Sequence, residues 1–204
     1  ILKKMFSFSM WILFESILLW LTSYAGTFIV RKFLTAYYLG IYKNSLSMVN
    51  SILSIVVSST VPVLLSALSK LKNNKLEYDK MFYEFQQKAC LLLIPIGVGV
   101  FLFRDLATNI LFGPKWAEAS FLVGLYALVN AVTILTGQYI SIAFTSKGYP
   151  KLAVLSQILQ LFEMVPILLF SVKQTFFIFV IGCCTATFLY GVINLILSKV
   201  FLKM

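Results

Sequence analysis

Two acidic residues lie in the middle of long apolar segments, where an ionised side chain is unusual. Glu15 lies in the first of these segments, and Glu163 lies in the fifth, with Gln157 and Gln160 on adjacent turns of about the same helix face. An ionised group at the bilayer centre costs about 2.5–3.5 kcal/mol on insertion scales, so such groups normally face protein or water. Both carboxylates are therefore candidates to bind a coupling proton or cation. The alternatives are a structural ion pair or a position nearer the membrane surface.

Small and weakly polar residues recur at helical spacing in three apolar segments. The three stripes are Asn44, Ser47, Ser51, Ser54 and Ser58; Asn130, Thr133, Gly137 and Ser141; and Thr187, Gly191, Asn194 and Ser198. Such stripes allow helices to approach and to hydrogen-bond across the contact, or they line a water-filled cavity. We expect the Ser47–Ser58 stripe to face protein or a cavity and not lipid. We count Asn50 and Asn130 among the candidate cavity residues.

Three basic residues flank the connection between the first two apolar segments. Arg31 and Lys32 precede this connection, and Lys43 follows it. These side chains could contact an anionic group such as a phosphate. The alternative is that they extend to the membrane surface, as long basic side chains at helix ends often do.

The sequence contains none of the common signatures of enzyme or metal chemistry. It has no His, no glycine-rich phosphate loop and no closely spaced acidic pair within its apolar segments, and its three Cys residues lack metal-ligand or redox spacing. We therefore expect no enzyme activity, no metal site and no cofactor. A membrane glycosyltransferase would need larger polar loops, and a membrane scaffold would have little need for acidic residues in the bilayer.

The composition explains why these polar residues stand out. Of the 204 residues, 60% are hydrophobic and 12% are charged, and the mean hydropathy is +0.94. Soluble domains are about 45–50% apolar and about 25% charged, so the chain is neither a soluble domain nor disordered. The net charge of +10 reflects basic residues clustered between apolar segments, which favours membrane topology over nucleic-acid binding.

Six segments are long and apolar enough to cross a membrane as helices. They are 6–30, 45–68, 88–103, 121–145, 152–172 and 176–197. Because the runs are continuously apolar and not alternating, they exclude a β-barrel. The predicted fold is an all-α, polytopic six-helix bundle formed by residues 1–204. Prolines at 62, 95 and 166 are expected to bend or interrupt three of the helices.

The third segment is short and is expected to start before Cys90. In the preceding loop, Tyr78, Phe82, Phe85 and Ala89 share one helix face. This stretch is either an interfacial helix or a plain extension of the third span.

The basic residues also predict the orientation. With a cytoplasmic N-terminus, 11 basic residues lie on the inside and 6 on the outside, in agreement with the positive-inside rule. Both ends are therefore expected in the cytoplasm. The chain begins with Ile1, just before a basic pair and an apolar run, so we interpret it as the C-terminal part of a longer protein.

Four stretches are similar to segments of bacterial polysaccharide and O-antigen exporters. They are FIVRKFLTAYYLGIY (28–42), VPVLLSALSK (61–70), LIPIGVGVFLFRDLATNILFGPKWAEA (93–119) and IAFTSKGYPKL (142–152). Their order and spacing match over nearly the whole chain, and the FG-x-x-W-x-x-A element is the most specific. The chain resembles the oligosaccharide flippases of the multidrug/oligosaccharidyl-lipid/polysaccharide exporter superfamily, in particular the lipopolysaccharide, colanic acid and teichuronic acid exporter branch.

The resemblance implies a transporter made of two six-helix bundles around a basic central cavity. Such proteins carry polyprenyl-diphosphate-linked glycans across the bacterial cytoplasmic membrane by alternating access, for cell-surface polysaccharide synthesis, and their transport is thought to be ion-coupled. The six spans match the C-terminal bundle, so the implied partners are the lipid-linked glycan, membrane lipids, a coupling proton or cation and the missing N-terminal bundle. A lone bundle is not expected to transport.

Two positions bear on this resemblance. Arg31 aligns with a frequent arginine of the family, whereas Gly26 stands where many members carry an acidic residue.

The alternative function is a multidrug or cation antiporter of the same superfamily, which would favour an acidic, aromatic-lined cavity.

Overall fold

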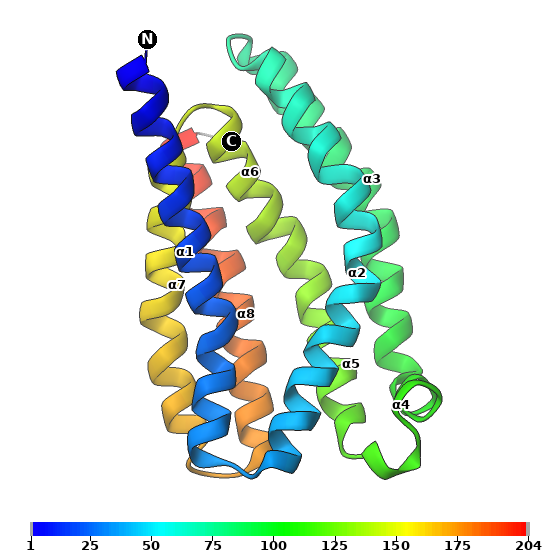
Figure 1. The fold of residues 1–204 in the computed structure, drawn as a ribbon. Coiled ribbons are helices and arrows are strands. Elements are labelled where there is room, and N and C mark those ends of the chain that lie inside the picture. The colour runs from blue at the N-terminus through cyan, green and yellow to red at the C-terminus, as the bar shows by residue number, and fades with distance from the viewer. Residues whose placement is uncertain (1, 203–204) are drawn as a thin grey trace.

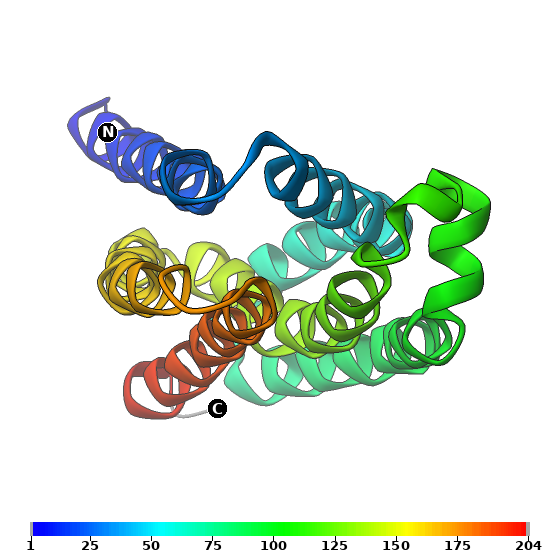
Figure 2. The ribbon, with the colours of Figure 1, turned by 90° about the horizontal axis from the view of Figure 1, so that it is seen from below.

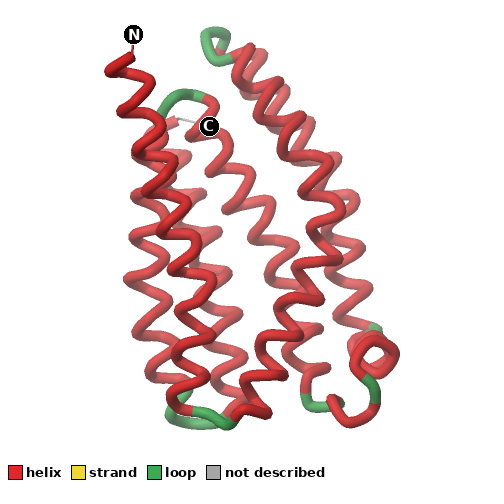
Figure 3. The backbone as a smooth tube through the Cα atoms, in the orientation of Figure 1, coloured by secondary structure: helices red, strands yellow, loops and turns green. Residues whose placement is uncertain are grey.

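The chain folds into helices joined by short turns (Figures 1 and 3). The computed structural model describes residues 2–202; for residues 2–5, 7 and 8 it describes the backbone. The elements are α1 (Leu2–Phe33), α2 (Ala36–Leu71), α3 (Lys75–Leu102), α4 (Arg104–Phe112), the 3-10 helix η1 (Pro114–Trp116), α5 (Ala119–Thr133), the π-helix η2 (Ile134–Gln138), α6 (Tyr139–Ser146), α7 (Pro150–Ser171), α8 (Phe176–Leu197) and the π-helix η3 (Ser198–Leu202). Residues 2–202 contain no strand, so the all-α prediction is confirmed.

Six helical segments in the described chain are long and apolar enough to span a membrane. They are Ser9–Phe33, Ala36–Leu71, Lys75–Leu102, Ala119–Ser146, Pro150–Ser171 and Phe176–Leu202. The six predicted spans are thus confirmed as helices, but the second and third begin earlier than predicted, at Ala36 and Lys75 instead of 45 and 88. The added segments carry charged and polar residues, such as Lys43 in α2 and Lys75 and Glu77 in α3, and hydropathy marks the apolar part of a helix and not its polar end.

The third span is one continuous helix, so the interpretation as a plain extension is right and a separate interfacial helix is wrong. The helix starts at Asn74, whose side-chain oxygen accepts a 3.4 Å hydrogen bond from the Glu77 amide. The face identified from the sequence packs inward, since Tyr78 and Phe82 are buried.

The three prolines do not interrupt their helices, although the sequence predicted that they would bend or interrupt three spans. Pro62, Pro95 and Pro166 all lie inside uninterrupted helices. The fourth span, which has no proline, instead changes to a π-helix at Ile134–Gln138 between α5 and α6. Such π-helical turns occur often at functional sites. The sequence also did not predict the short helix α4, which lies at the end of the bundle opposite the N-terminus (Figure 1).

The chain crosses the bundle six times, and both ends lie at the same end of the molecule, together with the α2–α3 and α6–α7 turns (Figure 1). This arrangement agrees with an even number of spans. That this end faces the cytoplasm stays a prediction. Three of the lysines that were assigned to the cytoplasmic side are not fully described: Lys203 lies outside the described residues, and for Lys3 and Lys4 the backbone alone is described.

The core consists of two clusters. The first joins α2, α3, α5 and α6 and includes Leu53, Tyr78 and Phe144. The second joins the start of α2 to α7 and α8 and includes Ile41 and Phe179. Large apolar side chains on the outside, such as those of exposed phenylalanines and leucines on α1, α7 and α8, are suited to contact lipid.

Small residues allow the closest helix contacts. A Cβ at Gly97 on α3 would lie 2.7 Å from the Cβ of Ala131 on α5. On α8, a Cβ at Gly191 would meet the Thr136 hydroxyl. Without a hydrophobic driving force in lipid, this close packing is what holds membrane helices together. The stripes that contain Gly137 and Gly191 therefore serve, at these positions, as packing surfaces.

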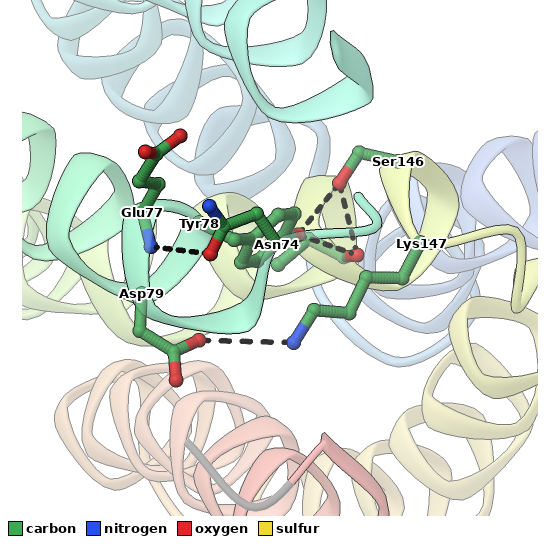
Figure 4. Close-up of polar contacts among 7 residues, drawn as sticks. Asn74, Glu77, Tyr78, Asp79, Ser146 and Lys147 are labelled. Atoms are coloured by element: carbon green, nitrogen blue, oxygen red, sulfur yellow. Dashed lines mark hydrogen bonds and ion pairs between the residues drawn. The ribbon is translucent and has the colours of Figure 1, made fainter. Parts of the chain in front are cut away.

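The start of α3 is fastened to the α6–α7 turn by a polar cluster (Figure 4). The Tyr78 hydroxyl donates to the Ala143 carbonyl oxygen at 3.1 Å and lies 2.7 Å from the Ser146 hydroxyl. Lys147 Nζ lies 3.8 Å from Asp79 Oδ1 and 4.2 Å from the centre of the Tyr78 ring. Partial burial lowers the pKa of Lys147 from its ordinary value, and the Asp79 carboxylate opposes this effect.

Candidate functional site

A cavity of about 800 Å³ lies among the helices. Its walls come from α1, α2, α5, η2, α6, α7 and α8. Seen along the bundle, α1 and α2 run along one face, with α5, α7 and α8 behind them (Figure 2). Asn50 on α2 lines the cavity and is also exposed, so the cavity is open to the surface at this face.

Five of the seven residues predicted from the sequence line this cavity. They are Glu15, Asn50, Asn130, Gln157 and Gln160. The structure therefore gathers side chains from α1, α2, α5 and α7 that the sequence could only place on separate helices. Neither Arg31 nor Glu163 is among the lining residues.

Glu15 is half-buried on α1 and faces α6. Its Oε1 accepts a hydrogen bond of 3.1 Å from the Ser141 hydroxyl. The ion pairs among the described side chains are Lys80–Glu84 and Lys147–Asp79. The structural ion pair considered for Glu15 is therefore not formed among these side chains.

Two amide side chains meet across the cavity between α2 and α5. Asn130 Nδ2 donates to Asn50 Oδ1 at 2.9 Å. An amide has two N–H donors and a carbonyl acceptor, so this single bond leaves donor capacity on Asn50 and acceptor capacity on Asn130. Both groups are available to a molecule in the cavity.

A second polar pair connects α7 and α8. Gln157 Nε2 donates to the Tyr190 hydroxyl at 2.9 Å. Gln157 is 1% exposed, and its Oε1 is buried without a hydrogen-bond partner among the described residues. Buried acceptors without a partner are uncommon in folded proteins.

The charge of the cavity differs from what the family resemblance implies. The charged residues among its lining are Glu15 and Lys43, one of each sign. Arg31 is exposed near the end of α1 and does not line the cavity. The expected basic cavity is therefore not found in this bundle.

Glu163 was expected on about the same face of its helix as Gln157 and Gln160, but it differs from them in its surroundings. The two glutamines line the cavity, whereas Glu163 does not. Glu163 is half-buried, and both of its carboxyl oxygens lack a hydrogen-bond partner among the described residues. At 100° per residue, position 163 lies about 120° around the helix from position 157, so the two side chains project toward different neighbours.

The exposed stripe on α2 also departs from expectation. Ser47, Ser51, Ser54 and Ser58 are exposed and do not line the cavity, so the expectation that this stripe faces protein or cavity fails within this chain. Three of these hydroxyls donate to carbonyl oxygens of their own helix. This bonding satisfies the hydroxyl donors in the absence of any partner helix.

Tyrosines form much of the remaining wall, and the sequence did not reveal them as cavity residues. They are Tyr24, Tyr42, Tyr126 and Tyr190. In an apolar span a tyrosine is indistinguishable from a core aromatic. The one available signal was Tyr190, which lies between Thr187 and Asn194 on the polar side of its helix. The Tyr42 hydroxyl occupies the space beside Gly26.

The comparison with known families agrees with the fold. The sequence pattern of a family described as "Polysaccharide biosynthesis protein" matches residues 1–121, which is more than half of the chain. The chain belongs to this polysaccharide biosynthesis protein family. The matched residues include Glu15 and Asn50 of the cavity and extend to the first turn of α5.

A relative supports the same assignment. Over 201 residues the chain is 25% identical to a Klebsiella pneumoniae protein described as an "Uncharacterized membrane protein in cps region". The match covers 98% of this chain and 41% of that protein, so the chain spans less than half the length of its relative. No solved structure matches the chain. Together with six apolar helices, these findings make it a multi-pass membrane protein related to polysaccharide biosynthesis.

Proposed function

We propose that this chain is one helix bundle of a transporter that moves a lipid-linked oligosaccharide across the cytoplasmic membrane for surface polysaccharide synthesis. The observation that carries the proposal is an open cavity of about 800 Å³, lined by many polar side chains and set among apolar spans, in a member of a polysaccharide biosynthesis family. A space with polar groups among membrane helices is what a polar cargo needs to cross hydrocarbon. The protein acts as a carrier and not as an enzyme.

The open face of the cavity supports a second bundle in the complete protein. Asn50 and the serine stripe of α2 are exposed on a helix that spans the membrane, where lipid is a poor neighbour for polar side chains. The relative is more than twice as long as the matched region. A second bundle against α1 and α2 would cover the stripe and close the cavity between the two halves, and alternating access would follow from rocking of the bundles.

Glu15 is the candidate site for a coupling proton or cation. Among the described residues it is the acidic side chain that lines the cavity, and its hydrogen bond with these residues, from Ser141, leaves the other carboxyl oxygen for a proton or cation. Arg31 and Glu163 are not among the residues that line the cavity, so Glu15 is the candidate that this proposal uses.

The proposal is tested with the complete gene in a bacterial strain that lacks its own repeat-unit flippase. Restored surface polysaccharide in the wild type, lost in Glu15→Gln and retained in Glu163→Gln, is the expected result. Absence of restoration with a matched donor of the repeat unit would contradict the proposal.

One observation favours a second function, that of a drug or cation antiporter. Glu15 and four tyrosines line the cavity, and an acidic, aromatic lining suits an organic cation. Resistance to cationic dyes without restored polysaccharide would select this function.

A further inference from the structure

We propose that this bundle binds the uncharged sugar rings of the cargo and that the diphosphate is held elsewhere in the complete protein. The inference rests on the proposed function and names the part of the substrate that this half of the cavity recognises.

The charge of the lining argues against a diphosphate site. One acidic and one basic side chain are present, so the described lining has no net charge. A diphosphate is multiply anionic and is normally held by several Arg or Lys side chains or by free backbone amides. The Glu15 carboxylate, which also lines the cavity, would repel a diphosphate.

The neutral lining suits hydroxyl groups instead. Five amide side chains line the cavity: Asn50, Asn130, Gln138, Gln157 and Gln160. Each amide offers donors and an acceptor in one plane, which matches a sugar hydroxyl that both donates and accepts. The tyrosine rings supply flat apolar surfaces for the C–H faces of a sugar.

Two positions are already arranged for such a ligand. The bond between Asn130 and Asn50 leaves N–H groups on Asn50 and the carbonyl oxygen of Asn130, and both side chains line the cavity, where a sugar hydroxyl can pair with either group. Gln157 Oε1 is buried and has no hydrogen-bond partner among the side chains that the structure describes, and its amide nitrogen donates to Tyr190. A donating hydroxyl in the cavity would satisfy this acceptor, whereas a phosphate oxygen would not.

The volume is compatible with this ligand. Sites for small molecules in proteins are typically about 300–1,000 Å³, and this cavity lies within that range at about 800 Å³. It is therefore large enough for part of an oligosaccharide without its lipid.

The test uses the complete protein, purified in nanodiscs, and two soluble probes in calorimetric titrations. One probe is the repeat-unit oligosaccharide released from the surface polysaccharide of the source strain. The other is farnesyl diphosphate, a short polyprenyl diphosphate without sugars. The variants are Asn130→Ala and Gln157→Ala, with Gln174→Ala in the exposed α7–α8 turn as the matched amide control. Thermal unfolding confirms that each variant is folded, and Gln160→Ala replaces any variant that is not.

We expect the oligosaccharide to bind the wild type and the control equally. Its affinity should fall about tenfold in each cavity variant, which corresponds to one lost hydrogen bond of about 1.4 kcal/mol. Affinity for farnesyl diphosphate should not change. Folded cavity variants that bind the oligosaccharide like the wild type, or that lose affinity for both probes equally, would overturn the inference.

The outcomes separate this inference from the proposed function. If surface polysaccharide is restored but the cavity variants bind the oligosaccharide like the wild type, the proposed transport function is supported and the proposed sugar site is contradicted. Binding of neither probe, with no restored polysaccharide, would overturn both.

Discussion

The Ser141 hydroxyl on α6 donates a 3.1 Å hydrogen bond to the carboxylate of Glu15 on α1, across 126 residues of sequence. Few side chains of α1 are buried, so this contact is a specific polar link between α1 and the wall of the cavity. Ser141 lies three residues after the π-helical turn Ile134–Gln138. The same turn contains cavity residues of its own, including Ile134 and Gln138.

Replacing Glu15 should impair transport more than replacing its partner. In the complete protein we expect Glu15→Gln to reduce surface polysaccharide at least tenfold, because it removes the ionisable group, and Ser141→Ala to reduce it less. Polysaccharide on the cell surface is measured by immunoblotting and normalised to protein level. Glu77→Gln, which changes an exposed acidic residue at the start of α3, is the control. Full transport by Glu15→Gln would remove Glu15 from the mechanism.

The serine stripe of α2 should face water or protein once the chain is complete. In a variant without Cys90, Cys183 and Cys184, we expect single cysteines at Ser51 and Ser54 to react with a membrane-impermeant maleimide in at least one state of the transporter. Cysteine at Ile55, which is 71% exposed on the neighbouring face, should not react, because lipid covers it. Equal labelling at 54 and 55 would mean that the stripe faces no second bundle.

Loss of the Tyr78 hydroxyl should destabilise the protein. Tyr78→Phe removes the bonds to Ala143 and Ser146 at a site with no exposure to solvent, and we expect a loss of about 1–2 kcal/mol. The change is measured by thermal unfolding in detergent. Tyr83→Phe, at a tyrosine that is 46% exposed, should leave stability unchanged. A Tyr78→Phe variant as stable as the wild type would show that the cluster in Figure 4 does not hold α3 to the α6–α7 turn.

Lys147 should make stability rise with pH in the alkaline range. Its pKa in the folded protein lies below the ordinary value of 10.5, chiefly because of burial, so between the two values the unfolded chain binds more protons than the folded one. Raising the pH through the lowered pKa toward 10.5 therefore relieves a penalty on the folded state. Unfolding measured at a series of alkaline pH values should show a smaller rise in Lys147→Met. The same slope in both proteins would exclude this contribution.

Replacing two glycines of α3 by alanine should have different effects on the stability of the protein. Gly97→Ala places a methyl group 2.7 Å from Ala131 Cβ and 3.1 Å from the Ala127 carbonyl oxygen, so α3 and α5 must separate and stability should fall by about 1–3 kcal/mol. Gly99→Ala meets nothing within 4 Å, and its better helix propensity should leave the protein equally or slightly more stable. Unfolding temperatures compare the two variants, and equal losses would show that the close contact is not what matters.

Much of this protein could be predicted from its sequence, because the bilayer imposes strong local constraints. A helix that crosses hydrocarbon must satisfy its own backbone hydrogen bonds, so composition and run length are sufficient to predict six helices and an all-α fold. The same reasoning selects polar residues in apolar runs as unusual, and it identified Glu15, Asn50, Asn130, Gln157 and Gln160 before they could be placed together.

The three-dimensional arrangement decided which of these residues share a site. Glu163 and Gln157 lie on one helix, but their rotation relative to α1 and α8 places one in the cavity and the other outside it. The π-helical turn in the fourth span, the pairing of Asn130 with Asn50 and the exposure of the α2 stripe all depend on contacts between helices far apart in the sequence. Spacing along one helix fixes which residues share a face, whereas packing against the other helices determines what that face meets.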